Sequence, residues 1–187
     1  ATFPQTVWVS EEVLLDLADT QTPQGIVAVI QKEEVGLPDF RQGKFLFLED
    51  VQDPGNVGTM IRTADAAGFT GVIVSDKSAD IYSLKTLRSM QGSHFHLPIY
   101  RMSVEGFVEE AKKSNLPILA TTLSKDSKDY HELSPLENFA LVMGNEGQGI
   151  SPVMVESADQ LVHIDMKGRA ESLNVAVAAG ILMFYFS

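Results

Sequence analysis

Short apolar runs alternate along most of the chain with stretches in which apolar residues recur every three or four positions. The runs are typical of buried strands, and the spaced stretches are typical of helices with one buried face. We predict strands at 26–31, 44–48, 71–75, 97–100, 116–121, 139–143 and 161–164, and helices at 57–67, 83–91, 104–114, 152–157 and 172–186. This alternation predicts an α/β fold with a mostly parallel sheet and helices on both faces.

The first 25 residues have a different pattern from the rest. Ser10 is a candidate N-cap for a short amphipathic helix over residues 11–19, and the T-Q-T-P-Q-G segment at 20–25 has the composition of a linker. We therefore divide the chain into an N-terminal piece, residues 1–25, and a main domain, residues 26–187.

Composition narrows the class of protein. The chain has 187 residues, of which 44% are hydrophobic and 21% charged, as in ordinary globular domains. The longest apolar stretch, Val175–Phe186, is too short to span a membrane, and residues 1–4 do not resemble a secretory signal. No Cys is present, which excludes disulfides and Cys-based zinc sites. We expect a cytoplasmic protein without a membrane partner, and the missing initiator Met indicates a piece of a longer chain.

The net charge of −11 argues against a polyanionic partner. The charge is unevenly distributed, because residues 51–101 carry five basic and four acidic side chains. Contacts with nucleic acid are therefore expected in this middle third, since phosphate binding depends on local potential.

Ligands of parallel sheets bind beyond the carboxyl ends of the strands, and a first polar motif follows the strand at 44–48. It reads D-P-G-N-V-G at 53–58, with Arg62 about 1.7 helical turns after Asn56. One interpretation is a helix capped by Asn56, with Arg62 on the surface. The other places Arg62 where it meets a phosphate or ribose oxygen.

A second motif, G-N-E-G-Q-G at 144–149, directly follows the strand at 139–143. Its G-x-x-G-x-G spacing and late position exclude the dinucleotide fingerprint of Rossmann dehydrogenases. The motif predicts either a tight turn or a loop whose backbone approaches a ligand closely. Glu146 would repel phosphate, so the ligand of such a loop would be an uncharged or cationic nucleoside-type molecule.

A third motif, I-D-M-K-G-R-A-E-S-L-N at 164–174, leads into the almost wholly apolar terminal helix. Ser172 is a candidate N-cap, which would place Asn174 in the first helical turn. A helix that is apolar all round must be buried in the core, against a second subunit, or both.

Two other kinds of site have little support. His94 and His96 lie close together, but no obvious third ligand accompanies them, so we expect no metal site. The chain also lacks a Gly-x-Ser-x-Gly elbow, which leaves a Ser-His-Asp hydrolase unsupported.

Taken in this order, the three motifs resemble those of the SpoU-type (TrmH-like) RNA ribose 2'-O-methyltransferases of the SPOUT superfamily. The resemblance covers about residues 44–186, with its motifs at 53–68, 141–149 and 164–180. The chain departs from the family pattern at Gly55, where many relatives carry His or Arg.

The resemblance implies a SPOUT-type α/β fold with a C-terminal trefoil knot, an exception to the rule against knots. It also implies S-adenosylmethionine as methyl donor and no metal. The residues that it assigns to the donor site are Gly144, Ile164, Leu173, Met143, Thr121 and Met166. Those that it assigns to catalysis are Arg62, Asn56, Glu146, Ser172 and Asn174, all of which are present.

The resemblance further implies an RNA partner, ribosomal RNA before transfer RNA, and a homodimer in which Arg62 acts near the partner's donor pocket. Residues 1–25 would then be the remnant of an N-terminal RNA-binding domain with its linker. A guanidinium is a poor base, so Arg62 is expected to hold the ribose hydroxyl and stabilise the developing alkoxide, while Glu146 or the substrate phosphate takes the proton.

Two other functions stay open on the residues alone. One is a non-catalytic RNA-binding or ribosome-assembly module that retains the donor pocket. The other is an unknotted small-molecule nucleotide enzyme, which the order and late position of the second motif disfavour.

Overall fold

The computed structural model describes residues 6–18, 20, 22–32 and 35–187, and the chain divides into two compact units, 1–34 and 35–187. The first unit contains helix α1 (Glu11–Ala18), whose first turn donates a hydrogen bond to Ser10: the Val13 N–H lies 3.4 Å from the accepting Ser10 Oγ. The helix predicted at 11–19 is thus present, and residue 19 lies outside the described residues.

The strand predicted at 26–31 is wrong. These residues form no strand, and Val29 and Ile30 are 100% and 62% exposed. An apolar run becomes a strand only where a second strand pairs with its backbone, and the described residues of the first unit contain none.

The second unit is built on a seven-stranded sheet in the order β3-β2-β1-β6-β4-β7-β5, and every neighbouring pair is parallel. Its strands are β1 (Lys44–Leu48), β2 (Gly71–Val74), β3 (Ile99–Arg101), β4 (Ile118–Thr121), β5 (Lys128–Asp129), β6 (Phe139–Met143) and β7 (Gln160–His163). The parallel α/β fold is confirmed. Strand β5 was not predicted, because its two polar residues carry no apolar pattern.

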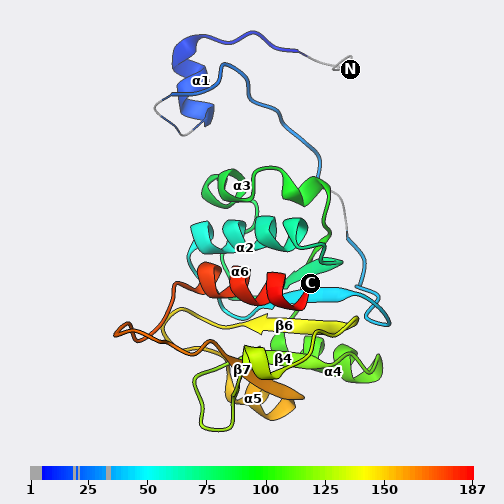
Figure 1. Cartoon of the computed structure of the whole chain (residues 1–187). Coiled ribbons are helices and arrows are strands. Elements are labelled where there is room, and N and C mark those ends of the chain that lie inside the picture. The colour runs from blue at the N-terminus through cyan, green and yellow to red at the C-terminus, as the bar shows by residue number, and fades with distance from the viewer. Residues whose placement is uncertain (1–5, 19, 21, 33–34) are drawn as a thin grey trace. The chain divides into compact units, whose positions relative to one another are not determined.

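Helices cover both faces of this sheet (Figure 1). They are α2 (Pro54–Ala66), α3 (Leu84–Met90), α4 (Val104–Lys113), α5 (Pro152–Ser157) and α6 (Val175–Phe186), with short 3-10 turns at Ser93–Phe95 and Tyr130–Glu132. In Figure 1, α2, α3 and α6 lie on one side of the sheet, and α4 and α5 lie on the other.

Each face has its own apolar core. On the α2 and α6 side, Leu46 and Leu48 pack in one cluster with Phe186. On the opposite side, Phe47 of β1 stacks on Phe107 of α4 with ring centroids 4.2 Å apart. Central strands buried on both faces explain why β1 and β6 read as continuous apolar runs rather than alternating ones.

In the described part of the chain, no helix is long and apolar enough to cross a membrane.

Candidate active site

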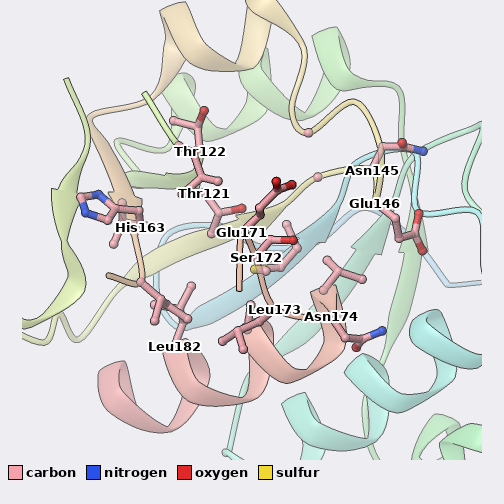
Figure 2. Close-up of a pocket in the computed structure, with 18 of the residues that line it drawn as sticks. Thr121, Thr122, Asn145, Glu146, His163, Glu171, Ser172, Leu173, Asn174 and Leu182 are labelled. Atoms are coloured by element: carbon pink, nitrogen blue, oxygen red, sulfur yellow. The ribbon is translucent and has the colours of Figure 1, made fainter. Parts of the chain in front are cut away.

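A cavity of about 670 Å³ lies beyond the carboxyl ends of β4, β6 and β7, against the start of α6 (Figure 2). All six residues predicted to bind the methyl donor line it: Thr121, Met143, Gly144, Ile164, Met166 and Leu173. Three of the predicted catalytic residues line it as well: Glu146, Ser172 and Asn174. The second and third motifs, which lie about twenty residues apart in sequence, thus form two walls of one cavity.

The second motif is a loop closed by its own backbone. Asn145 and Gly149 exchange two backbone hydrogen bonds of 3.0 and 2.9 Å. At Gly144, a Cβ atom would lie 2.4 Å from the Gly149 carbonyl carbon and 2.6 Å from the Ile150 nitrogen. Only glycine fits at this position, so the motif requires a residue without a side chain here because the backbone approaches so closely.

Asn145, which was not predicted as a site residue, holds this loop in place. Its Oδ1 accepts from the N–H groups of Gly147 and Gln148 at 2.9 and 3.0 Å, and its Nδ2 donates to the Asp50 carbonyl at 2.8 Å. The side chain therefore ties the loop after β6 to the residue that follows β1. An Asn after the first glycine of such a loop was the available signal, because Asn side chains readily bond the backbone two residues on.

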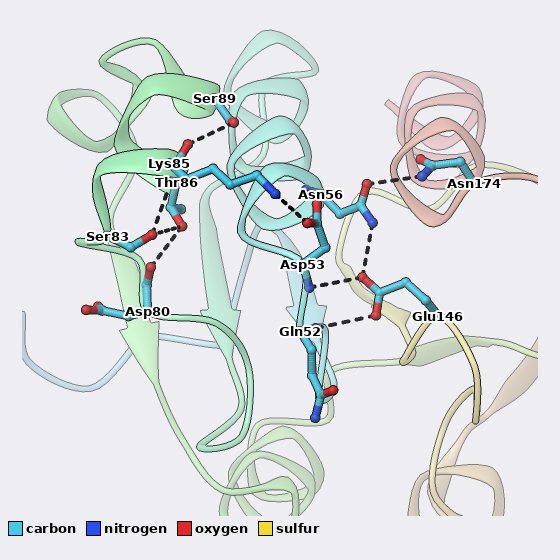
Figure 3. Close-up of polar contacts among 10 residues, drawn as sticks. All are labelled: Gln52, Asp53, Asn56, Asp80, Ser83, Lys85, Thr86, Ser89, Glu146 and Asn174. Carbon is cyan, nitrogen blue, oxygen red and sulfur yellow. Dashed lines mark hydrogen bonds and ion pairs between the residues drawn. The ribbon is translucent and has the colours of Figure 1, made fainter. Parts of the chain in front are cut away.

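Glu146 and Asn56 join the second motif to the first (Figure 3). Asn56 Nδ2 donates to Glu146 Oε1 at 3.0 Å, and Asn174 Nδ2 donates to Asn56 Oδ1 at 3.1 Å. One residue from each of the three motifs therefore belongs to a single hydrogen-bonded chain. Asn56 does not line the cavity itself, but it contacts two residues that do.

Glu146 is held as a carboxylate. Partial burial by itself would raise the pKa of Glu146, but the hydrogen bond from Asn56 and those from backbone N–H groups, including Gln52 and Asp53, lower it below its usual 4.5. A carboxylate with a lowered pKa is a weak base near neutral pH and a good hydrogen-bond acceptor. Glu146 is therefore suited to orienting the Asn56 side chain.

The cap predicted for α2 was wrong. Asp53, not Asn56, is the N-cap, and its Oδ2 accepts from the Asn56 N–H at 2.8 Å. Pro54 occupies the first helical position, so the cap is the residue before it, Asp53. The Asn56 side chain is therefore free to form hydrogen bonds with Glu146 and Asn174. Lys85 pairs with Asp53 Oδ1 at 2.8 Å, and the pKa of Asp53 is lowered, first by Lys85 and then by the Asn56 N–H.

The cap predicted for α6 was also wrong. Asn174 is the N-cap, with Oδ1 accepting from the N–H groups of Ala176 and Val177 at 2.9 and 3.3 Å, and the helix begins at Val175. Ser172 instead lies in the preceding loop and lines the cavity (Figure 2). Asn is as good a cap as Ser, so sequence alone could not choose between two caps two residues apart.

Asp129, at the end of β5, supports the third motif. Its Oδ2 accepts from the Asp165 N–H at 3.0 Å, and its Oδ1 accepts from the His131 N–H and lies 2.9 Å from His131 Nδ1. Burial alone would raise the pKa of Asp129, but these hydrogen bonds lower it. Asp165 lies between Ile164 and Met166, so Asp129 positions two of the predicted donor-binding residues.

Arg62 lies outside the cavity. It is exposed on α2 and has no hydrogen-bond or ion-pair partner among the described residues. The structure therefore brings Asn56, Glu146 and Asn174 together but does not place Arg62 in the cavity of its own chain.

The side chains that line the cavity fit a cationic ligand. They include two carboxylates, Glu146 and Glu171, and neither Lys nor Arg. Such a lining disfavours polyphosphate ligands and suits S-adenosylmethionine, whose sulfonium and ammonium groups outweigh its one carboxylate. Within the described ranges, no three His, Asp or Glu side chains are grouped so that they could hold a metal ion.

Comparison with known proteins decides the family. Residues 43–184 match the family model described as the SpoU rRNA Methylase family. The chain belongs to this family. The RNA methyltransferase resemblance and the α/β fold class predicted from sequence are thereby confirmed.

Individual relatives agree with this assignment. The chain is 44% identical over 181 residues to the 23S rRNA (guanosine(2553)-2'-O)-methyltransferase RlmP of Bacillus subtilis, covering 97% of this chain and 72% of that protein. It is similar to an AdoMet-bound rRNA methyltransferase from Sinorhizobium meliloti, with a TM-score of 0.86, 35% identity, and 94% and 69% of the two chains covered. A crystal structure of an RNA 2'-O ribose methyltransferase matches with a TM-score of 0.80 and 32% identity, covering 94% of this chain and 69% of that one.

These relatives support S-adenosylmethionine as the cofactor of this family. The trefoil knot and the roles of individual site residues stay predictions.

Proposed function

We propose that the protein transfers a methyl group from S-adenosylmethionine to the 2'-hydroxyl of a ribose in ribosomal RNA. The observation that carries this proposal is the hydrogen-bonded chain Glu146–Asn56–Asn174, which joins all three motifs at the edge of a cavity lined by two carboxylates and by no Lys or Arg of the described residues. Membership of the SpoU rRNA Methylase family and the similarity to RlmP support ribosomal RNA over transfer RNA as substrate.

When bound, S-adenosylmethionine supplies an electrophilic methyl group, whose C–S bond breaks as the bond to the ribose oxygen forms, leaving a neutral thioether. The protein must align the hydroxyl with that methyl group, and the hydroxyl must lose one proton. Asn56, oriented by Glu146 and Asn174, is placed to hydrogen-bond the reacting groups at the cavity edge. Ser172 has no hydrogen-bond partner among the described residues, so its hydroxyl is available to the donor or the ribose.

Arg62 is assigned to the ribose hydroxyl and its neighbouring phosphate, where a guanidinium stabilises developing negative charge. It would act at the cavity of a second copy of the chain, since it does not line its own. Glu146 accepts several hydrogen bonds and has a lowered pKa, so it is a poor proton acceptor, and the proton of the ribose hydroxyl passes to solvent water.

A homodimer is part of this proposal. Val177, Ile181 and Phe184 are 52%, 36% and 58% exposed and recur on one face of α6. A second copy packed on this face would bury an apolar surface that otherwise meets water. Light scattering should give twice the chain mass at micromolar concentration, and a monomer there would contradict both the dimer and the shared site.

The experiment that tests the proposed function combines Arg62→Ala with a methylation assay on ribosomal RNA and calorimetry with S-adenosylhomocysteine. We expect methylation to fall by at least about a hundredfold, as for loss of one group that stabilises transition-state charge, while cofactor affinity stays unchanged. Arg41→Ala is the matched control, because Arg41 pairs with Asp39 away from the cavity. An unchanged methylation rate in Arg62→Ala would refute the role of Arg62.

Mapping 2'-O-methyl groups in RNA from a deletion strain would identify the modified nucleotide. Cofactor binding without methyl transfer to any RNA would favour the non-catalytic RNA-binding module instead. We further propose that residues 1–25 are the remnant of an N-terminal RNA-binding domain and linker, and that the protein works in the cytoplasm, where such a substrate is found.

A further inference from the structure

Two carboxylates line the cavity, and they differ in their surroundings. Glu146 accepts hydrogen bonds from Asn56 and from the N–H groups of Gln52 and Asp53. Glu171 has no hydrogen-bond or ion-pair partner among the described residues, and Figure 2 shows its carboxylate directed into the middle of the cavity. Its charge is therefore unsatisfied by this chain and is available to a ligand.

No Lys or Arg among the described residues lines the cavity to balance that charge. The nearest basic side chains in sequence are Lys167 and Arg169, which do not line the cavity, and Lys167 is already paired with Asp165. A carboxylate left unpaired beside a ligand site favours a ligand that brings positive charge.

Resting on the proposed function, we propose that Glu171 is a specificity-determining residue that distinguishes the methyl donor from the spent cofactor by charge. The donor carries a sulfonium, and its product carries a neutral thioether in the same place. Both carry the same ammonium and carboxylate groups. Attraction between Glu171 and the sulfonium therefore strengthens binding of the donor alone, and loss of that charge in the reaction weakens the hold on the product.

The expected size of this effect is modest, because Glu171 is exposed. Exposed charge pairs contribute about 0.2–1 kcal/mol, which converts to about a 1.4- to fivefold difference in affinity. At equal concentrations of the two forms of the cofactor, a preference of this size shifts occupancy of the cavity toward the donor.

The test is isothermal calorimetry with three probes: S-adenosylmethionine, S-adenosylhomocysteine, and sinefungin, in which a protonated amine replaces the methylsulfonium. In Glu171→Gln we expect affinity for the two cationic probes to fall about 1.4- to fivefold, with affinity for the homocysteine product unchanged. Glu171→Lys should widen the loss for the cationic probes, and high salt should shrink the effect in the wild type. Glu156→Gln and Glu156→Lys, at an exposed position outside the cavity, make the same net-charge changes and should alter none of the three affinities.

Equal weakening of all three probes in Glu171→Gln would overturn the proposal, because it would place Glu171 at the shared ammonium group. Unchanged affinities for all three would overturn it as well. Neither result would affect the proposed function, which fails separately if the wild-type protein binds none of the three probes.

Discussion

The two loops that wall the cavity are built in opposite ways. The second-motif loop (144–149) closes on itself through paired backbone hydrogen bonds and is fastened to the end of β1 by Asn145. The third-motif loop (165–173) is held chiefly at its ends, by Asp129 at Asp165 and by the cap of α6 at Asn174. Between these ends, residues 168–173 are all exposed and make no hydrogen bond with any described residue.

The two kinds of loop suit two different tasks of a transferase: positioning its own reacting groups and binding its ligands. A loop that satisfies its own polar groups keeps its shape without a ligand, and it can hold the reacting groups in register before substrate arrives. A loop with free polar groups has them available for the ligand, as Ser172 and Glu171 do. Substitutions in the second-motif loop should therefore reduce the stability of the protein itself, whereas those in the third-motif loop should chiefly reduce ligand binding.

The largest effect is expected for Gly144→Ala. The new Cβ would lie 2.4 Å from backbone of Gly149, which cannot move away without opening the loop. We expect the free energy of unfolding to fall by about 3 kcal/mol, at the upper end for overpacking, and S-adenosylhomocysteine binding to become undetectable. Urea unfolding and calorimetry measure the two effects.

Gly168→Ala in the third-motif loop is the matched control. A Cβ at this position would have no atom within 4 Å, and its backbone is not left-handed. We expect a change below about 0.5 kcal/mol, as for surface substitutions. Similar losses of stability in Gly144→Ala and Gly168→Ala would mean that the two loops do not differ in how tightly their backbones are packed.

The next effect is expected for Asn145→Ala, which removes three hydrogen bonds of 2.8–3.0 Å. At about 0.5–1.5 kcal/mol each, and with some replaced by water, the expected loss of stability is about 2 kcal/mol. Asn145→Asp should retain the bonds from Gly147 and Gln148 but lose the donor to the Asp50 carbonyl, so its loss should be intermediate. An alanine variant as stable as the wild type would show that the backbone pairing alone closes the loop.

How far the sequence predicts these features depends on what kind of interaction makes them. The buried strands and the three motifs were visible, because apolar runs and glycine spacing are local signals. The caps were misassigned at Asn56 and Ser172, because suitable capping residues occur two or three positions apart and packing chooses between them. Asp129 and the Glu146–Asn56–Asn174 chain could not be predicted, since their partners lie 36 to 118 residues away in sequence.

A smaller effect is expected for Asn174→Ala, at the far end of the third-motif loop. The substitution removes the N-cap of α6 and the bond to Asn56, and loss of a cap costs about 1 kcal/mol. Ser172→Ala should leave the free energy of unfolding unchanged, since Ser172 is not the cap, and should reduce methylation instead. A loss of stability in Ser172→Ala equal to that of Asn174→Ala would place the cap at Ser172 in solution.

The smallest effect concerns acid pH, and it involves one carboxylate from the second-motif loop and one that supports the third-motif loop. The pKa values of Glu146 and Asp129 are both lowered in the folded protein. Each group therefore contributes stability above its unfolded pKa, and that contribution is lost as the pH falls through the lower, folded value. Solvent screening keeps the Glu146 contribution below about 1 kcal/mol.

Urea unfolding between pH 7 and pH 3 can separate the two carboxylates. Glu146→Gln and Asp129→Asn should each be less stable than the wild type at pH 7, and each difference should begin to shrink as the pH falls below the unfolded pKa, because protonation then favours the unfolded wild-type chain. The walls should differ in the accompanying calorimetry at pH 7. Asp129→Asn loosens the segment around Asp165, so it should weaken S-adenosylhomocysteine binding although it costs little stability. Glu146→Gln disturbs Asn56, so it should reduce methylation while cofactor affinity is retained. Equal effects of the two variants in both measurements would mean that the two loops of the cavity are not held independently of each other.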